Sequence, residues 1–246
     1  NFLDLTFTAN PNHVRALCQE MIDRKINLKW WCESRANIPL ELLENMKKAG
    51  CVSLVVGVES GSPDIISKIS KNISIQEVIN FCKRCNKLDI FVQPYFMYSH
   101  PDETEKDLEK TLALIDELEQ FTLPCSLQPT IILPGTEIER LARSKGILLE
   151  KFSWYDDYKY YLNIELGQLI NIPLYIDKLN PDIIKKYIKE RNDKVSMKAY
   201  IKYSNTLNLK EKFVKVINSI IKGKPSSRYI FHPRFYYEYI MSKLKK

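Results

Sequence analysis

The sequence predicts an α/β fold, a partial parallel βα barrel of the TIM-like type with a carboxyl-terminal helical appendage. Apolar stretches that suit buried strands alternate with stretches that carry helical spacing or helix caps. Polar residues recur where each apolar stretch ends. Repeated strand–helix units require parallel strands joined by helical crossovers, so the alternatives are a barrel and an open doubly wound sheet.

Five strand–helix units are expected in order along the chain. Strands are expected at residues 2–7, 28–32, 52–58, 90–97 and 125–133. The helices that follow them are expected at residues 12–25, 39–49, 63 to about 88, 103–121 and 136–145, the third with a break near 71–74. Gly50 and Gly146 follow two of these helices, as carboxyl-terminal caps do.

The third unit contains the stretch "GVESGSPDII", where a buried strand ends and a helix begins. Pro63 suits the first turn of that helix and Ser62 suits its amino-terminal cap. Glu59 and Ser60 therefore lie at the carboxyl end of a strand. Either they form a turn with a solvated glutamate, or they contact a ligand there.

The fourth unit has the clearest helix, "DETEKDLEKTLALIDELEQF". Its apolar residues repeat at helical spacing, at Leu108, Leu112, Ile115 and Leu118. Acidic residues crowd its first turn, where the helix dipole favours negative charge.

Polar residues end every expected strand, which favours a barrel mouth over the single crevice of an open sheet. They are Asp4 and Thr6, Ser34 and Arg35, Glu59 and Ser60, Ser99 and His100, and the run Pro134, Gly135 and Thr136. The sequence has no GxGxxG and no GxxxxGK[ST] pattern, which argues against nucleotide binding of those two kinds.

The composition suits a globular protein of 246 residues, with 45% hydrophobic and 27% charged residues. No apolar run is long enough to span a membrane. The six cysteines are too sparse for a disulfide framework, so a reducing cytoplasm is expected. The chain does not begin with Met, and we expect its natural start to lie upstream.

Basic charge is concentrated in the second part of the chain. Residues 1–150 carry 17 Lys and Arg against 21 Asp and Glu, whereas residues 151–246 carry 20 against 9. A basic region can bind RNA, a membrane surface or an acidic partner. The lysines are dispersed and no nucleic-acid motif frames them, which favours a solvated helical surface. We expect residues 158–246 to form a mainly helical region.

Taken in order, the strand ends resemble those of the radical SAM superfamily, in the branch that has cobalamin-dependent members. The stretches that carry the resemblance are "FLDLTFTANPNHVRALCQEM", "LKWWCESRANIPLELLENMKKAGC", "VSLVVGVESGSPDIISKISKNIS", "FVQPYFMYSHPDETEKDLEKTL" and "LQPTIILPGTEIERLARSKGIL". They cover residues 1–157, the expected core barrel. Five motifs in the right order are a specific signal.

The resemblance implies an enzyme that reductively cleaves S-adenosylmethionine to a 5′-deoxyadenosyl radical, which abstracts hydrogen or initiates methyl transfer. It implies S-adenosylmethionine and a [4Fe–4S] cluster as cofactors, with cobalamin in a cobalamin-dependent methyltransferase. It also implies a reductant protein such as flavodoxin or ferredoxin. The substrate cannot be read from the sequence, and no catalytic residue is assigned.

Two departures from the family pattern matter. The family's CxxxCxxC loop, which holds the cluster through three thiolates, is missing. The simplest account is that this loop and the first strand lie before Asn1. Cys82 and Cys85 form the only close pair and are interpreted as ordinary helical cysteines, because two thiolates do not fill a cluster's coordination shell. In "YSHPDET", Ser99 and Asp102 stand where the family usually has glycine.

Nine residues are candidate cofactor contacts, each weighed against a structural role. The candidates are Glu59, Ser60, Lys71, Ser34, Arg35, Asp4, Thr6, Tyr95 and Gln128. The competing structural roles are helix capping for Glu59 and Ser60, a solvated side chain for Lys71, and a strand-end salt bridge for Ser34 and Arg35. For Asp4 and Thr6 the alternative is capping of the next helix, and for Tyr95 and Gln128 it is a strand register that points them outward. Carboxylates and hydroxyls suit ribose hydroxyls and an ammonium, and a cation suits a carboxylate. His100 suits either a substrate-side or a structural role.

Two other functions remain open. A degenerate barrel could bind a partner without catalysis, and a CxxxCxxC motif in frame upstream would argue against that. A basic RNA-binding module would show steeply salt-dependent affinity for RNA.

Overall fold

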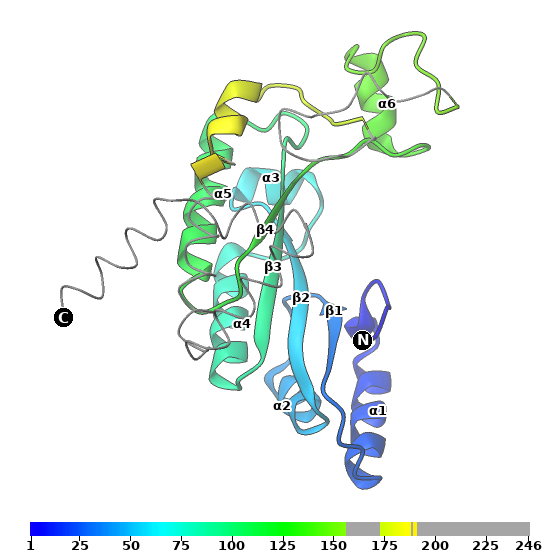
Figure 1. The fold of residues 1–246 in the computed structure, drawn as a ribbon, viewed down its shortest axis with the longest axis vertical. Coiled ribbons are helices and arrows are strands. Elements are labelled where there is room, and N and C mark those ends of the chain that lie inside the picture. Colours follow the sequence, from blue (N-terminus) through cyan, green and yellow to red (C-terminus); the bar gives the residue numbers. More distant parts are fainter. Residues whose placement is uncertain (156–172, 188, 191–246) are drawn as a thin grey trace, which may run out of the picture. The chain divides into compact units, whose positions relative to one another are not determined.

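The computed structural model describes residues 1–155, 173–187 and 189–190 (Figure 1). Its contacts divide the chain into two compact units, residues 1–185 and residues 186–246. The first unit holds all the strands described below. The helical prediction for residues 158–246 falls largely outside the described residues and stays a prediction, as does the role of the basic residues there. Residues 181–187 are helical.

Four parallel strands form one sheet in the order of the chain, β1-β2-β3-β4 (Figure 1). Their bounds are β1 Trp30–Ser34, β2 Cys51–Glu59, β3 Phe91–Tyr98 and β4 Ser126–Pro129. In a barrel, strands that follow one another in the sequence are also neighbours in the sheet. In a doubly wound sheet, the order of the strands reverses partway across. The fold class predicted from the sequence is confirmed as a parallel α/β sheet that forms part of a barrel.

Helices connect the strands close to the expected positions. They are α1 Pro11–Asp23, α2 Leu40–Lys48, α3 Pro63–Lys68, α4 Ile75–Lys87, α5 Glu105–Leu118 and α6 Glu137–Ser144. The expected break in the third helical stretch is confirmed, because the Ser74 side chain and Glu77 form a capping box that starts α4. The two expected glycine caps are also confirmed, since Gly50 and Gly146 both have positive φ.

One face of the sheet is buried against the helices and the other is more open. In β1, Trp30, Cys32 and Ser34 are buried while Trp31 and Glu33 are exposed. The main core joins the inward residues of the strands to α1, α2, α4 and α5. All six cysteines lie buried as free thiols. Strand alternation therefore leaves one sheet face free to carry polar groups.

The prediction of a first strand at residues 2–7 is wrong. The Phe2 amide makes one backbone bond, to the Trp31 carbonyl at 3.1 Å, and the chain then turns into a short 3-10 helix, η1 Phe7–Ala9. The alternating apolar residues that suggested a strand do not share a buried face: Leu3 and Leu5 are 81% and 91% exposed. Instead, Phe2 packs on Trp30 and Phe7.

The fifth strand is shorter than expected because the chain changes partner after Pro129. The Thr130 amide still bonds the Tyr98 carbonyl at 2.9 Å. Ile131 then forms an antiparallel bridge with Leu174. The residues that follow them, Ile132 and Tyr175, form a second small core with Ala142 and Leu148.

The turn after β3 has left-handed backbone at the two positions where the resemblance leads us to expect glycine. Ser99 and Asp102 have φ of 64° and 60°, in the left-handed region that glycine adopts most easily. The buried Glu103 carboxylate accepts a hydrogen bond from the His100 amide at 2.9 Å. Within the described part of the chain, the second oxygen of Glu103, Ser99 Oγ and His100 Nε2 are buried without a hydrogen-bond partner.

No helix among the described residues is long and apolar enough to cross a membrane.

Glu103 makes the stability of the fold depend on pH. Burial raises the pKa of its carboxyl from 4.5 to about 7, against the lowering effect of bonds from the His100 and Ser99 amides. Between those two values the folded state holds more protons than the unfolded state, so the free energy of unfolding falls as pH rises from about 4.5 to 7. We expect Glu103→Gln to remove this slope, on the order of 2–3 kcal/mol across the window.

Urea unfolding of both forms at a series of pH values measures the difference. His100 acts in the opposite direction, since burial lowers its pKa and its protonation destabilises the fold as pH falls. Comparing the variant with the parent at each pH cancels that contribution. Parallel stability curves for the two proteins would contradict the prediction.

Candidate functional site

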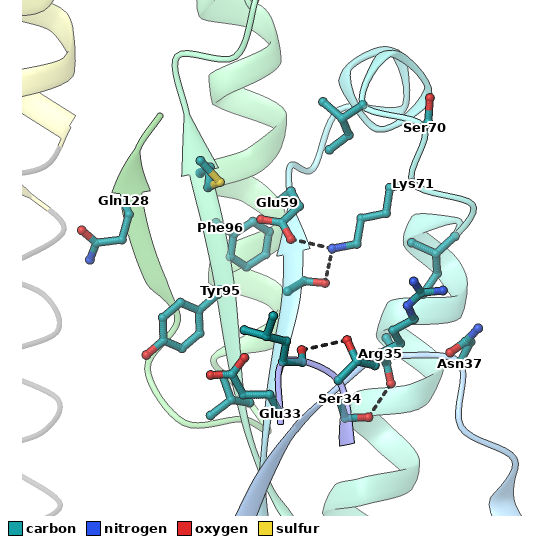
Figure 2. Close-up of a pocket in the computed structure, with 18 of the residues that line it drawn as sticks. Glu33, Ser34, Arg35, Asn37, Glu59, Ser70, Lys71, Tyr95, Phe96 and Gln128 are labelled. Carbon is teal, nitrogen blue, oxygen red and sulfur yellow. Dashed lines mark hydrogen bonds and ion pairs between the residues drawn. The ribbon is translucent and has the colours of Figure 1, made fainter. Parts of the chain in front are cut away.

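A cavity of about 1020 Å³ lies on the open face of the sheet and reaches the carboxyl ends of β1 and β2. Its walls come from all four strands, from the amino-terminal segment, from the residues that follow β1 and from the loop between α3 and α4 (Figure 2). The polar lining residues are Thr6, Glu33, Ser34, Arg35, Asn37, Glu59, Ser70, Lys71, Asn72, Tyr95 and Gln128. Seven of the nine candidate residues from the sequence therefore line one cavity.

An ion pair in the cavity wall joins Glu59 to Lys71. Lys71 Nζ lies 2.6 Å from Glu59 Oε1 and donates to the Gly57 carbonyl at 2.6 Å (Figure 2). Both side chains are about a quarter exposed. The pair fixes the α3–α4 loop against the end of β2 and leaves the second oxygen of Glu59 without a hydrogen bond in the described structure.

The backbone around Glu59 is shaped to present its carboxylate. The register between β2 and β3 shifts between Gly57 and Glu59, and Glu59 has φ of 71°. Bulges of this kind redirect side chains near binding sites. A positive φ at a residue other than glycine is uncommon and persists only where the surroundings hold it.

The two glycines of "GVESGS" are required for different reasons. A Cβ on Gly57 would lie 2.4 Å from Glu59 Oε1 and 3.1 Å from Lys71 Nζ, so the absent side chain makes room for the ion pair. A Cβ on Gly61 would lie 2.5 Å from the Lys110 carbonyl oxygen, so this glycine allows the turn to approach α5.

Ser60 does not line the cavity. Its hydroxyl is fully buried, lies 3.1 Å from Thr111 Oγ1 and accepts from the Ser62 amide at 3.0 Å. The structure therefore places Ser60 in a network that fixes the start of α3. Ser62 is the amino-terminal cap residue by position, but its hydroxyl donates to Asp107 on α5 at 2.6 Å and caps nothing.

Ser34 and Arg35 end β1 and have different environments. Ser34 is 7% exposed, and its hydroxyl bonds Thr8 Oγ1 at 3.0 Å and the Arg35 carbonyl at 2.9 Å. Arg35 is exposed in the cavity wall (Figure 2). No ion pair of its guanidinium is recorded within residues 1–155, 173–187 and 189–190, so the salt-bridge alternative finds no support there.

The remaining candidates divide between the cavity and other places. Thr6, Tyr95 and Gln128 line the cavity, so the two strand residues face it. Asp4 is exposed and does not line it. Neither Asp4 nor Thr6 caps α1, because the Asn10 side chain accepts from its first amides. His100 is 6% exposed and is also absent from the lining, which favours a structural role.

Sequence reasoning missed Glu33, Asn37, Ser70 and Asn72, which line the cavity. Glu33 had a usable signal, since strand alternation places it on the open face two residues before Arg35. Asn37 and Asn72 lie in loops, where no periodicity indicates which way a side chain points.

The six cysteines are buried free thiols. No group of three or more His, Cys, Asp or Glu in the described part of the chain is placed to hold a metal ion. Burial raises the pKa of all the thiols for which a shift is resolved, to about 11 for Cys18 and about 12 for Cys51 and Cys82. Cys82 and Cys85 are buried in α4, so the interpretation of this pair as ordinary helical cysteines is confirmed.

The comparisons with known proteins agree with the motifs. Residues 2–115 match the family model described as the radical SAM superfamily. An uncharacterised methyltransferase of Pyrococcus horikoshii is 27% identical over 210 residues, which cover 80% of this chain and 44% of that protein. The chain therefore spans less than half the length of this curated relative.

Two solved structures share the fold at low identity. The radical S-adenosylmethionine methyltransferase TsrM from Kitasatospora setae, with cobalamin and a [4Fe–4S] cluster bound, is 17% identical, with a TM-score of 0.50. The match covers 56% of this chain and 28% of TsrM. OxsB, a cobalamin-dependent S-adenosylmethionine radical enzyme, is 14% identical, with a TM-score of 0.52 over 85% of this chain and 35% of OxsB.

We expect alanine substitutions at the two glycines to differ in their effects on stability and on the Glu59–Lys71 ion pair. In Gly57→Ala the new methyl group meets only the tips of two flexible side chains, so we expect a small loss of stability together with a broken ion pair. Limited trypsin digestion should then cut after Lys71 several times faster than in the parent. In Gly61→Ala the methyl group meets backbone, and overpacking of that kind costs roughly 1–3 kcal/mol.

Thermal melts of the two variants provide the control for the digestion. The melting temperature should fall more in Gly61→Ala than in Gly57→Ala. Unchanged cleavage after Lys71 in Gly57→Ala would show that the pair does not hold the loop.

Proposed function

We propose that this chain, whose residues 2–115 match the family model of the radical SAM superfamily, is part of an enzyme that reductively cleaves S-adenosylmethionine, and specifically of a cobalamin-dependent methyltransferase. The observation that carries the proposal is the cavity at the carboxyl ends of β1 and β2, where Arg35 and the Glu59–Lys71 pair line the wall. Ligands of barrels and parallel sheets bind at this end of the strands.

The lining suits the parts of S-adenosylmethionine. Arg35 offers a guanidinium that suits a carboxylate, and the second oxygen of Glu59 offers an acceptor for ribose hydroxyls or an ammonium. The apolar side chains of Ile69 and Ile73 line the same wall and suit contact with a purine ring. A volume of about 1020 Å³ is at the upper end of the range typical of small-molecule pockets.

The chain's own residues would bind and orient the cofactor rather than exchange protons with it. S-adenosylmethionine supplies a 5′-deoxyadenosyl radical or a transferable methyl group when it is bound. Lys71 would act as a positioning residue, because its two bonds hold the Glu59 carboxylate and close the α3–α4 loop over the strand end. The same loop would keep water from that side of the cavity.

The described residues do not suit a [4Fe–4S] cluster, because no three thiols among them are placed to hold a metal ion. We therefore assign no residue of this part of the chain to the cluster. Cobalamin is proposed from TsrM and OxsB, and methyl transfer also from the methyltransferase of Pyrococcus horikoshii, without any assigned contact. A reductant protein of the flavodoxin or ferredoxin kind and a cytoplasmic location remain predictions.

Glu59 is the residue that tests cofactor binding. We expect Glu59→Gln to weaken S-adenosylmethionine binding by roughly 10- to 100-fold, because a hydrogen bond to a charged group contributes about 1.5–3 kcal/mol. Isothermal titration calorimetry of the full chain, with melts of each variant, measures this. Glu137→Gln is the matched control, since it also removes an ion-paired carboxylate, on the exposed surface of α6.

Ser60→Ala separates the binding role from the structural one. Its hydroxyl lies in the buried network with Thr111, so we expect a lower melting temperature and nearly unchanged affinity. A Glu59→Gln variant that binds as tightly as the parent would remove the basis of the proposal.

The thiols give a second test. Buried, protonated and separated cysteines are poor ligands for iron, so the described thiols should not assemble a cluster. We expect anaerobic incubation of the chain with iron and sulfide, followed by desalting, to leave far less than one cluster per chain. Retention of stoichiometric iron with cluster absorbance would show that cysteines of this chain hold the cluster.

A further inference from the structure

We infer that the part of the cavity over the sheet face is a substrate subsite for an aromatic or similarly apolar molecule that carries an ammonium group, and that Glu33 recognises this group. The inference rests on the proposed function, because it assumes that the strand ends of the same cavity hold S-adenosylmethionine. It adds a residue and a chemical class of substrate that the family match does not supply.

The two parts of the cavity differ in chemistry. At the strand ends, Arg35, Glu59 and Lys71 provide charge of both signs. Over the sheet face, before the strand ends, the lining includes the apolar Val55 and the aromatic Tyr95. Glu33 on β1 is the one charged side chain that lines this second part among the described residues (Figure 2).

The strand register places Glu33 beside this apolar surface. Glu33 pairs with Val55 across β1 and β2, and Gly57, two residues further along β2, pairs with Tyr95 on β3. The space that a Gly57 side chain would fill is taken by the Glu59–Lys71 pair, which therefore borders this surface. Tyr95 is 38% exposed and offers a ring face to a ligand in the cavity.

Glu33 has no recorded partner for its charge. Within residues 1–155, 173–187 and 189–190, it makes no recorded ion pair or side-chain hydrogen bond, whereas Glu59 is paired with Lys71. Arg35, which follows Glu33 by two residues in the chain, does not form an ion pair with it within the described residues. A carboxylate beside apolar walls favours a ligand that brings positive charge and N–H donors.

The aromatic neighbour narrows the class of ligand. The face of a tyrosine ring attracts a cation and stacks against another ring. Carboxylate and ring together therefore suit an aromatic amine, and they disfavour an aromatic carboxylate of the same size because Glu33 would repel it.

Two probes that share a phenyl ring test the inference: 2-phenylethylamine, which is a cation, and 3-phenylpropionate, which is an anion. Each is titrated into the full chain with S-adenosylmethionine present, and ligand-observed NMR measures the dissociation constant. We expect the parent to bind the amine at least about 5-fold more tightly than the acid, and Glu33→Gln to lose about 5- to 20-fold in amine affinity.

Glu44→Gln is the matched control, since Glu44 is an exposed glutamate on α2 outside the cavity and is not recorded in an ion pair. It should keep the preference for the amine. Tyr95→Ala should weaken binding of both probes through the lost ring, while it keeps their order.

Several outcomes overturn the inference. The first is that the parent shows no preference for the amine over the acid. The second is that Glu33→Gln keeps the same preference for the amine as the parent. The third is that Glu33→Gln lowers the melting temperature strongly without a change in the affinity for either probe. Titration of S-adenosylmethionine alone separates this result from the proposed function. If the amine preference holds but S-adenosylmethionine does not bind the parent, the subsite stands and the cofactor assignment fails.

Discussion

The ion pair between Glu59 and Lys71 is the interaction on which the cavity depends. It joins the end of a core strand to the loop between α3 and α4, and that loop forms one wall of the cavity. The pair is possible because Gly57 leaves space where any other residue would place a methyl group. Since both side chains are only about a quarter exposed, water screens the pair less than it screens a surface salt bridge.

The one-sided sheet explains why the polar groups gather where they do. Helices cover one face with the main apolar core, so polar side chains cannot be placed there without a partner. Polar side chains therefore lie on the opposite face and at the carboxyl ends of the strands. Strand alternation places Glu33 on that face, and Arg35, which follows the end of β1, lines the same cavity. The buried side therefore supports the fold and the open side carries the proposed chemistry.

The turn after β3 shows how a departure from the family pattern is accommodated. Ser99 and Asp102 adopt conformations that glycine would adopt with less strain. Glu103 holds the turn through the His100 amide, and Asp102 bonds Lys145 at 3.2 Å and pairs with Lys178 at 3.3 Å. These contacts explain how the turn persists, but nothing in the structure explains why these residues replaced glycine.

The sequence by itself determined the parallel α/β fold, the order of the motifs and most of the helix starts. These features depend on local patterns such as the Ser74 capping box and Pro63 in the first turn of α3, which neighbouring residues specify. Only the tertiary structure decided that residues 2–7 turn away from the sheet, that the Ser60 hydroxyl faces Thr111, and that Glu33 shares a cavity with Tyr95. Each of these depends on contacts between residues far apart in the chain, and a local pattern does not encode such contacts.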